Sequence, residues 1–254
     1  MLIGWRVVES VHGEMVPKMK TLGIIGGLGP ETGCKFYMSI NNRFRNIKKC
    51  QPNLLLENLP ISEGAERNII EGNLGKKHEQ LLNKSIKRMN HAKVDFIVIP
   101  CNTVHVFIEK LREKSKKPIL SIIEETAKEC SKLKVKKVGL LGSSKTIKEK
   151  LYEITLRNHG MEVIIPKQQE QIKINEIIIR VIHNQATGED KQFLISLIKK
   201  MKEDGAERII LGCTDLPLLL KQEDINIHLI NSLECLENAA FNRILNYTTH
   251  RRQQ

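Results

Sequence analysis

Apolar residues in this chain gather into short runs that are separated by longer amphipathic stretches. Runs rich in Ile, Val and Leu, without strict alternation, are typical of parallel strands covered on both faces. They predict strands at residues 21–25, 53–58, 94–100, 118–122, 137–142, 162–166, 206–212 and 226–230. Helical periodicity predicts helices at residues 30–45, 78–92, 124–133, 146–159, 172–184, 190–204 and 232–245. Because consecutive parallel strands need a crossover helix, this alternation indicates an α/β fold.

The two halves of the chain repeat one pattern. Residues 21–26 and 137–142 are both apolar runs that enter a glycine loop and then a helical stretch. Later in each half, residues 94–101 and 206–213 form a strand that ends in a small or turn residue followed by cysteine. Both resemblances occur in the same order and at nearly the same spacing. We therefore predict two similar doubly wound lobes with parallel four-stranded sheets, related by a pseudo-twofold axis.

The expected boundaries follow from these elements. The first lobe is expected at residues 19–118 and the second at 119–230, and 231–246 form a helix that packs back on the first lobe. Residues 1–18, which contain no long apolar region, are expected to be a loose extension, and 247–254 a disordered tail. No apolar run approaches the length of a membrane-spanning helix, so we expect a cytoplasmic protein with no membrane partner.

The net charge of +12 changes this picture little. It allows either nucleic-acid binding or a solvated basic surface. Lysines cluster at 114–117 and 134–137, at predicted helix ends, without the interleaved aromatic residues that a single-strand binder uses. This favours a solvated surface, which can steer anionic small molecules, and no nucleic-acid partner is expected.

The chain has six cysteines, at positions 34, 50, 101, 130, 213 and 235. No two of them form a CxxC pair, so a structural zinc site is not expected, and without a secretion signal neither is a disulfide framework. A cysteine in such a protein is by default a small buried hydrophobe. Cys101 and Cys213 differ because they occupy the same place in both repeats, after a strand and before a helix.

This placement suits proton transfer at carbon. Ligands of open parallel sheets bind beyond the carboxyl ends of the strands, and a helix N-terminus lowers the pKa of a nearby thiol. Facing lobes would put the two sulfurs on opposite sides of one cleft. One thiolate could then remove a proton from Cα while the opposing thiol returns one to the other face. The polar residues beside them, Asn102, Thr103 and Thr214, could stabilise charge on the substrate carboxylate.

The glycine loops at 26–30 and 142–144 also follow strands. They lack the order of a dinucleotide fingerprint and a Walker lysine, so phosphate binding is not favoured. We expect the first loop to be a tight turn whose backbone, at Gly27, approaches the substrate. Thr146, after the second loop, is either a further substrate contact or a hydroxyl near a helix N-cap.

Three motifs carry a resemblance to a known family. Residues 22–30 read Leu-Gly-Ile-Ile-Gly-Gly-Leu-Gly-Pro, residues 99–105 Ile-Pro-Cys-Asn-Thr-Val-His, and residues 211–215 Leu-Gly-Cys-Thr-Asp. Together they are similar to the aspartate/glutamate racemase superfamily, over about residues 20–240. The Gly-Gly-Leu-Gly-Pro loop, and Asp-Leu-Pro where the glutamate branch usually has His-Pro, point to the aspartate racemase branch. The resemblance implies a homodimer, a cleft between lobes, and a mechanism without cofactor or metal that uses Cys101 and Cys213 as the acid/base pair.

The resemblance also implies further site residues. The aspartate branch holds the distal carboxylate with an Arg after the first helix and a Lys in the second lobe. Among Arg43, Arg45 and Lys48 we take Arg45 for the first role, and Lys173 for the second. Asp215 stands where the branch usually has Glu, and either orients the second thiol or is an acid at a helix start. His105, one helical turn after Cys101, would polarise that thiol, contact the substrate or pack in the core.

The substrate predicted in this way is aspartate, with glutamate or a broad range of amino acids as alternatives. A maleate-type cis–trans isomerase or a decarboxylase of the same superfamily is the enzyme alternative. A two-lobed protein that binds a small molecule without chemistry is the non-enzyme alternative. The presence of both cysteines favours the enzyme.

Overall fold

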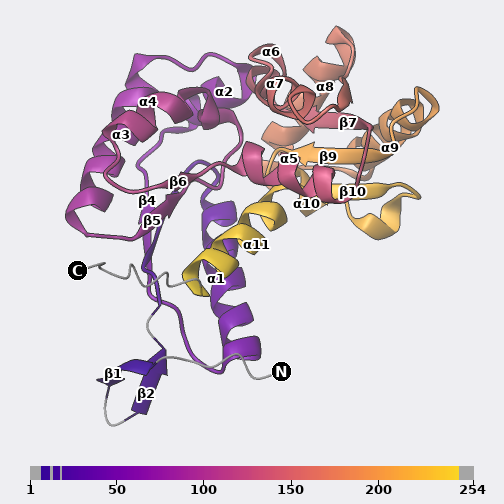
Figure 1. Ribbon diagram of the computed structural model, residues 1–254. Helices are drawn as coiled ribbons and strands as arrows, with labels where there is room; N and C mark the ends of the chain where they lie inside the picture. Colours follow the sequence, from indigo (N-terminus) through magenta and orange to yellow (C-terminus); the bar gives the residue numbers. More distant parts are fainter. Residues whose placement is uncertain (1–6, 12–13, 18, 246–254) are drawn as a thin grey trace.

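The computed structural model describes residues 7–11, 14–17 and 19–245, which form two α/β lobes and a separate hairpin (Figure 1). Each lobe is built on a four-stranded sheet whose strands are all parallel. The strand order is β4-β3-β5-β6 in the first sheet and, taken from its other edge, β8-β7-β9-β10 in the second. Both sheets therefore place their second strand at one edge, followed by the first, third and fourth. This confirms the predicted fold of two similar α/β lobes.

The first sheet contains β3 (Leu22–Gly26), β4 (Leu54–Asn58), β5 (Phe96–Val98) and β6 (Ile119–Leu120). Its helical segments are α1 (Pro30–Arg43), the π-helical turn η1 (Phe44–Lys48), α2 (Glu63–Glu71), α3 (Lys76–His91), the 3-10 turn η2 (Thr103–Phe107) and α4 (Ile108–Lys114). The boundary expected after residue 118 falls just before β6. Because β6 pairs with β5, the first sheet extends to Leu120.

The second sheet contains β7 (Lys137–Gly142), β8 (Glu162–Ile164), β9 (Arg208–Gly212) and β10 (His228–Asn231). Its helical segments are α5 (Ile122–Lys132), α6 (Ser144–Lys148), α7 (Leu151–Arg157), α8 (Gln168–Ile182), α9 (Gly188–Glu203), α10 (Leu216–Leu219) and the 3-10 turn η3 (Gln222–Asp224). The last element of the described residues is α11 (Ser232–Leu245).

The internal repeat extends to the packing of the first strand in each sheet. Gly23 in β3 and Gly139 in β7 occupy equivalent positions. A Cβ at Gly23 would lie 2.8 Å from Sδ of Met89, and one at Gly139 would lie 3.0 Å from Sδ of Met201. Each lobe thus uses a strand glycine so that a methionine of a covering helix can pack against the sheet.

The two lobes share a continuous apolar core. One cluster of buried side chains includes Phe36 and Phe96 of the first lobe, Leu140 of the second, and Phe241 of α11. Helix α11 also joins the lobes through polar contacts, since Ser39 of α1 donates a hydrogen bond to Glu237 at 2.7 Å. In Figure 1, α11 runs between α1 and the second sheet. The lobes are therefore fixed to each other on the side of α11.

Two described stretches, 7–11 and 14–17, lie within the N-terminal segment that was expected to be a loose extension. Strands β1 (Val7–Val11) and β2 (Glu14–Pro17) pair antiparallel as a two-stranded sheet of their own. Figure 1 shows this hairpin apart from both lobes. The tail expected at 247–254 lies outside the described residues. Within the described ranges, no helix has the length and apolar character needed to cross a membrane.

Candidate active site

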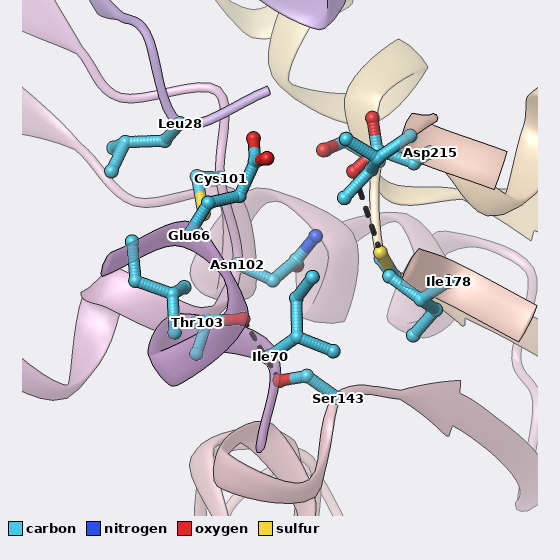
Figure 2. Close-up of a pocket in the computed structure, with 13 residues that line it drawn as sticks. Leu28, Glu66, Ile70, Cys101, Asn102, Thr103, Ser143, Ile178 and Asp215 are labelled. Carbon is cyan, nitrogen blue, oxygen red and sulfur yellow. Dashed lines mark hydrogen bonds between the residues drawn. The ribbon is translucent and has the colours of Figure 1, made fainter. Parts of the chain in front are cut away.

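A pocket lies between the lobes, beyond the carboxyl ends of both sheets (Figure 2). The first lobe contributes Cys101, Asn102 and Thr103 to its wall, and the second contributes Ser143, Cys213, Thr214 and Asp215. The free space available to the centres of water molecules is about 20 Å³, which is room for one water. The described conformation is therefore closed around the two cysteines.

The Cys101 thiol is buried, with a relative exposure of 7% for the residue. Backbone N–H groups of Thr103 and Val104 at the start of η2 point toward the sulfur and lower its pKa. Burial acts in the opposite direction and is the larger effect, so the pKa of Cys101 is raised to about 11. The helix-start donors are present as expected. The predicted lowering of the pKa is nevertheless wrong for this site, because desolvation by burial outweighs these donors.

Cys213 has the same environment in the second lobe. It follows β9 directly, and backbone N–H groups of Asp215 and Leu216 point toward its sulfur. Burial, followed by the negative charge of Asp215, raises the pKa of Cys213 well above its ordinary value. The Cys101 thiol contributes to the same rise, so the two sulfurs lie close enough to interact. Both thiols are therefore protonated at neutral pH.

The Asp215 carboxylate connects the second thiol with the first lobe. It accepts a hydrogen bond from Cys213 Sγ at 3.7 Å and one from Thr32 Oγ1 of α1 at 2.8 Å. Burial raises the pKa of Asp215 to about 6, and the charges of Glu66 and Glu31 add to this effect. At neutral pH the carboxylate is mostly ionised and is the hydrogen-bond acceptor for the Cys213 thiol.

The glycine loop of the first lobe makes room for this carboxylate. Gly29 has a φ of +99°, and a Cβ there would lie 3.2 Å from Asp215 Oδ1. Gly27 also has a positive φ, of +85°, but a Cβ on it would meet the backbone of Leu59. The structure therefore places Gly29 against the site, while Gly27 packs against the following loop and does not line the pocket.

Hydroxyl and amide groups form the polar wall between the two cysteines. Thr103 Oγ1 and Ser143 Oγ share a hydrogen bond of 2.8 Å that crosses from one lobe to the other (Figure 2). Ser143 also contacts Thr146 Oγ1 at 3.0 Å, which places Thr146 behind the wall, outside the lining. The Thr214 hydroxyl makes no hydrogen bond within the described part of the chain and stays available for a ligand.

Asn102 is held at both ends of its amide. Its Nδ2 donates to Ser232 Oγ at 3.1 Å, and its Oδ1 accepts from the hydroxyl of Tyr152 at 2.6 Å. Both partners belong to elements that follow the first sheet. Asn102 therefore fixes the end of β5 against the second lobe while its side chain lines the pocket.

His105 acts on the backbone of Cys101. The amide N–H of Ile122 donates to His105 Nε2 at 3.3 Å, so Nδ1 carries the proton and donates to the Cys101 carbonyl oxygen at 2.8 Å. Burial lowers the pKa of His105 to about 4, so the ring is neutral. Among the possibilities left open by the sequence, the structure places His105 in the packed core, where it fixes the carbonyl of Cys101.

The two cations expected to hold a distal carboxylate lie away from the pocket. Arg45 is exposed on η1, and Lys173 is exposed on α8, where it pairs with Glu176 at 3.5 Å. Neither residue lines the pocket. The pocket thus contains Cys101, Cys213 and the polar residues that follow each of them, but it contains neither of these two cations.

Sequence reasoning missed helix α2, which carries part of the pocket wall. The Ser62 side chain caps this helix by accepting from the Ala65 amide, and Gly72 ends it with a φ of +95°. These two residues are the sequence signal that could have revealed the helix. In Figure 1, α2 lies beside α6 of the second lobe, and it also packs against α8. It thereby brings Glu66, Ile69 and Ile70 to the pocket.

Comparisons with known proteins agree with this architecture. The sequence model of the Asp/Glu/Hydantoin racemase family matches residues 25–240. The broad specificity amino-acid racemase RacX of Bacillus subtilis (strain 168) is 28% identical over 231 residues, which cover 89% of this chain and 99% of RacX.

Solved structures show the same similarity. An aspartate racemase homologue from Pyrococcus horikoshii OT3 superposes with a TM-score of 0.73 at 29% identity, covering 88% of this chain and 98% of that one. The aspartate racemase of Picrophilus torridus gives a TM-score of 0.73 at 24% identity, with 91% and 96% of the two chains covered. The second comparison shows the fold alone.

Proposed function

The chain belongs to the Asp/Glu/Hydantoin racemase family, and we propose that it is a cofactor-independent amino-acid racemase in which Cys101 and Cys213 exchange protons with the two faces of Cα. The observation that carries the proposal is the position of these thiols. They come from equivalent strand ends of two repeated lobes and line one pocket from opposite lobes. A racemase needs an acid on one face of Cα and a base on the other, which two such thiols can supply.

Asp215 provides the first base. Its ionised carboxylate accepts the proton of Cys213, and the resulting thiolate removes the α-proton of the bound enantiomer. The electron pair left on Cα then takes a proton from the Cys101 thiol on the opposite face, which leaves Cys101 as thiolate and forms the mirror-image amino acid. After product release, Cys101 takes a proton from solvent and Asp215 loses one to solvent, which restores the starting state. The opposite enantiomer reacts with the roles of the two sulfurs exchanged.

The closed pocket lowers the cost of the carbanion. The backbone N–H groups at the starts of η2 and α10, and the hydroxyls of Thr103, Ser143 and Thr214, surround the space where the α-carboxylate would lie. Donors fixed in a site without bulk water stabilise negative charge that develops during the reaction. The raised thiol pKa values also fit a base that must attack a weakly acidic C–H bond, because a thiolate of higher pKa is the stronger base.

Aspartate is the substrate that the resemblance to the aspartate racemase branch favours, with glutamate or a broader range as alternatives. The relative RacX is described as having broad specificity. By the same resemblance, the active form is a cytoplasmic homodimer. The residues around the two thiols bear on the chemistry at Cα, and the residues in the other half of the pocket determine which substrate side chain fits.

The test follows α-proton exchange. The protein is incubated with single enantiomers of a panel of amino acids in deuterated water, without pyridoxal phosphate. Mass spectrometry reports deuterium at Cα, and chiral chromatography reports inversion. We expect both signals with at least one amino acid, and their complete absence across the panel would reject the proposal.

Cysteine variants test the two-thiol scheme. Cys101→Ala and Cys213→Ala should each abolish inversion, while either one can retain exchange with a single enantiomer. Cys34→Ala is the matched control, because Cys34 is an exposed cysteine of α1 outside the pocket. Full racemisation by either pocket variant would exclude an obligatory pair of thiols.

A further inference from the structure

The pocket has a second half that contains no reacting group. Its wall consists of Leu28 with two isoleucines from α2, Ile69 and Ile70, and two from α8, Ile178 and Ile182. The remaining residue of this half is Glu66, also on α2. Figure 2 shows Glu66, Ile70 and Ile178 around the same space as Cys101 and Asp215. A substrate side chain that points away from the cysteines would meet this apolar wall and this one carboxylate.

The charges around this space are negative. Apart from the thiols, the ionisable groups among the described lining residues are Glu66 and Asp215, and no lysine, arginine or histidine is among them. Glu31 adds to the field, since its charge raises the pKa of both carboxyls. The nearest opposing group that acts on Glu66 is His183, which is exposed. An anionic side chain would therefore be repelled from this half of the pocket.

The Glu66 carboxylate lacks a direct partner among the described residues, and the opposing charge of the exposed His183 acts on it only from beyond ion-pair distance. Glu66 is half-buried, and within the described residues it makes no hydrogen bond and no ion pair. Glu71 of the same helix, by contrast, pairs with Arg67 at 3.8 Å. A partly desolvated carboxylate without a partner is unfavourable unless a ligand supplies one. Burial accordingly raises the pKa of Glu66.

We infer that the site prefers amino acids whose side chain is an aliphatic stem ending in a cation, such as lysine, ornithine and arginine, with Glu66 as the partner of that cation. The methylene groups of the stem pack against the isoleucines of α2 and α8, and the charged end reaches Glu66. This inference rests on the proposed racemase function, because it concerns the side chain of the same substrate. It departs from the aspartate expected by resemblance, since the pocket lacks a cation and holds a carboxylate.

Lysine and norleucine provide a matched pair of substrates, because they differ chiefly in the terminal ammonium group. We expect kcat/KM for racemisation to be on the order of tenfold higher for lysine than for norleucine, and higher for lysine than for aspartate or glutamate. Glu66→Gln should bring the ratio of lysine to norleucine close to one. Glu63→Gln, which removes a charge from an exposed position one turn earlier in α2, should leave the ratio within about twofold.

A binding measurement separates this inference from the racemase function. Titration calorimetry on the Cys101→Ala variant should give on the order of tenfold tighter binding for lysine than for aspartate, and Glu66→Gln in the same background should remove the difference. Tighter binding of aspartate, or a lysine preference that survives Glu66→Gln, would overturn the inference even in an active racemase. If no amino acid exchanges its α-proton but lysine binds through Glu66, the racemase function fails and the assigned side-chain class stands.

Discussion

The hydroxyl of Thr32 donates to the Asp215 carboxylate at 2.8 Å, and it does so from the opposite lobe. The same carboxylate accepts from the thiol of Cys213. One hydrogen bond thus links the first lobe to the charge beside the second cysteine. Because this bond lowers the pKa of Asp215, that pKa would be higher without it.

Thr32→Val tests this link. The Thr32 hydrogen bond lowers the pKa of Asp215, so its removal should move that pKa further above about 6. The acidic limb of the profile of kcat/KM against pH should then shift to higher pH, and kcat/KM at neutral pH should fall by roughly tenfold. Thr155→Val is the control, since its hydroxyl bonds only to a carbonyl of its own helix, Leu151. An unshifted acidic limb would separate Thr32 from the titration of Asp215.

We expect the Asp215 carboxyl and the two thiols to determine how the activity of the wild-type protein depends on pH. Below a pH of about 6, Asp215 is protonated and cannot accept the proton of Cys213, so activity should fall as pH falls. Above neutral pH, activity should level off, because burial keeps both thiols protonated: it raises the pKa of Cys101 to about 11 and that of Cys213 well above its ordinary value. Initial rates between pH 5 and 10 measure the acidic limb and the plateau, and a maximum below pH 7 would contradict this assignment.

Asp215→Asn isolates the acidic limb. The amide keeps the size of the side chain but cannot take the thiol proton. We expect kcat to fall by roughly 100-fold and the limb at about pH 6 to disappear, with the remaining rate rising only with hydroxide concentration. A variant that keeps the limb near pH 6 would assign that titration to another group.

Much of this site was predictable because local patterns encode it. The runs of Ile, Val and Leu gave the strands, and the repeat placed Cys101 and Cys213 at equivalent strand ends. Parallel sheets bring such ends to one side, so two residues far apart in sequence could be expected to face a common space. The polar residues directly after each cysteine followed from the same argument.

Other features of the site depend on how distant parts of the chain pack together, which local sequence patterns do not reveal. They are the pKa values of the thiols, the position of Glu66 and the partner of His105. The thiol pKa values follow from burial, which outweighs the helix-start donors visible in the sequence. Glu66 reaches the pocket because α2 docks on α6 and α8, a contact between distant parts of the chain. The hydrogen bond between the Ile122 amide and His105 could not be predicted from the sequence, because Ile122 lies beyond β6.

Gly29→Ala tests the fit of the glycine loop around Asp215. The alanine would have to adopt a φ near +99°, and its Cβ would lie 3.2 Å from the carboxylate. Strain in the left-handed region costs about 1–2 kcal/mol, so the free energy of unfolding should fall by this amount. Activity should fall more than stability, because the carboxylate is displaced from Thr32 and Cys213. Gly64→Ala is the control, as a Cβ there meets nothing within 4 Å.

Glu237 should make stability depend on pH through the contact between α1 and α11. Its carboxyl is buried beside Ser39, and burial raises its pKa to about 7 from an ordinary value of 4.5. The folded protein therefore holds this proton more tightly than the unfolded chain. The resulting stabilisation is fully present below pH 4.5 and is lost as pH rises toward 7.

Glu237→Gln keeps a hydrogen-bonding side chain of the same size without the charge. The variant should be more stable than the wild type by roughly 2 kcal/mol at pH 8 and nearly equal to it at pH 4. Urea unfolding at the two pH values measures the difference. A matched change at the exposed Glu234 position, Glu234→Gln, should leave stability within about 0.5 kcal/mol at both. If Glu237→Gln shows the same stability difference from wild type at pH 4 and pH 8, the proton on Glu237 has no part in holding α11 against the first lobe.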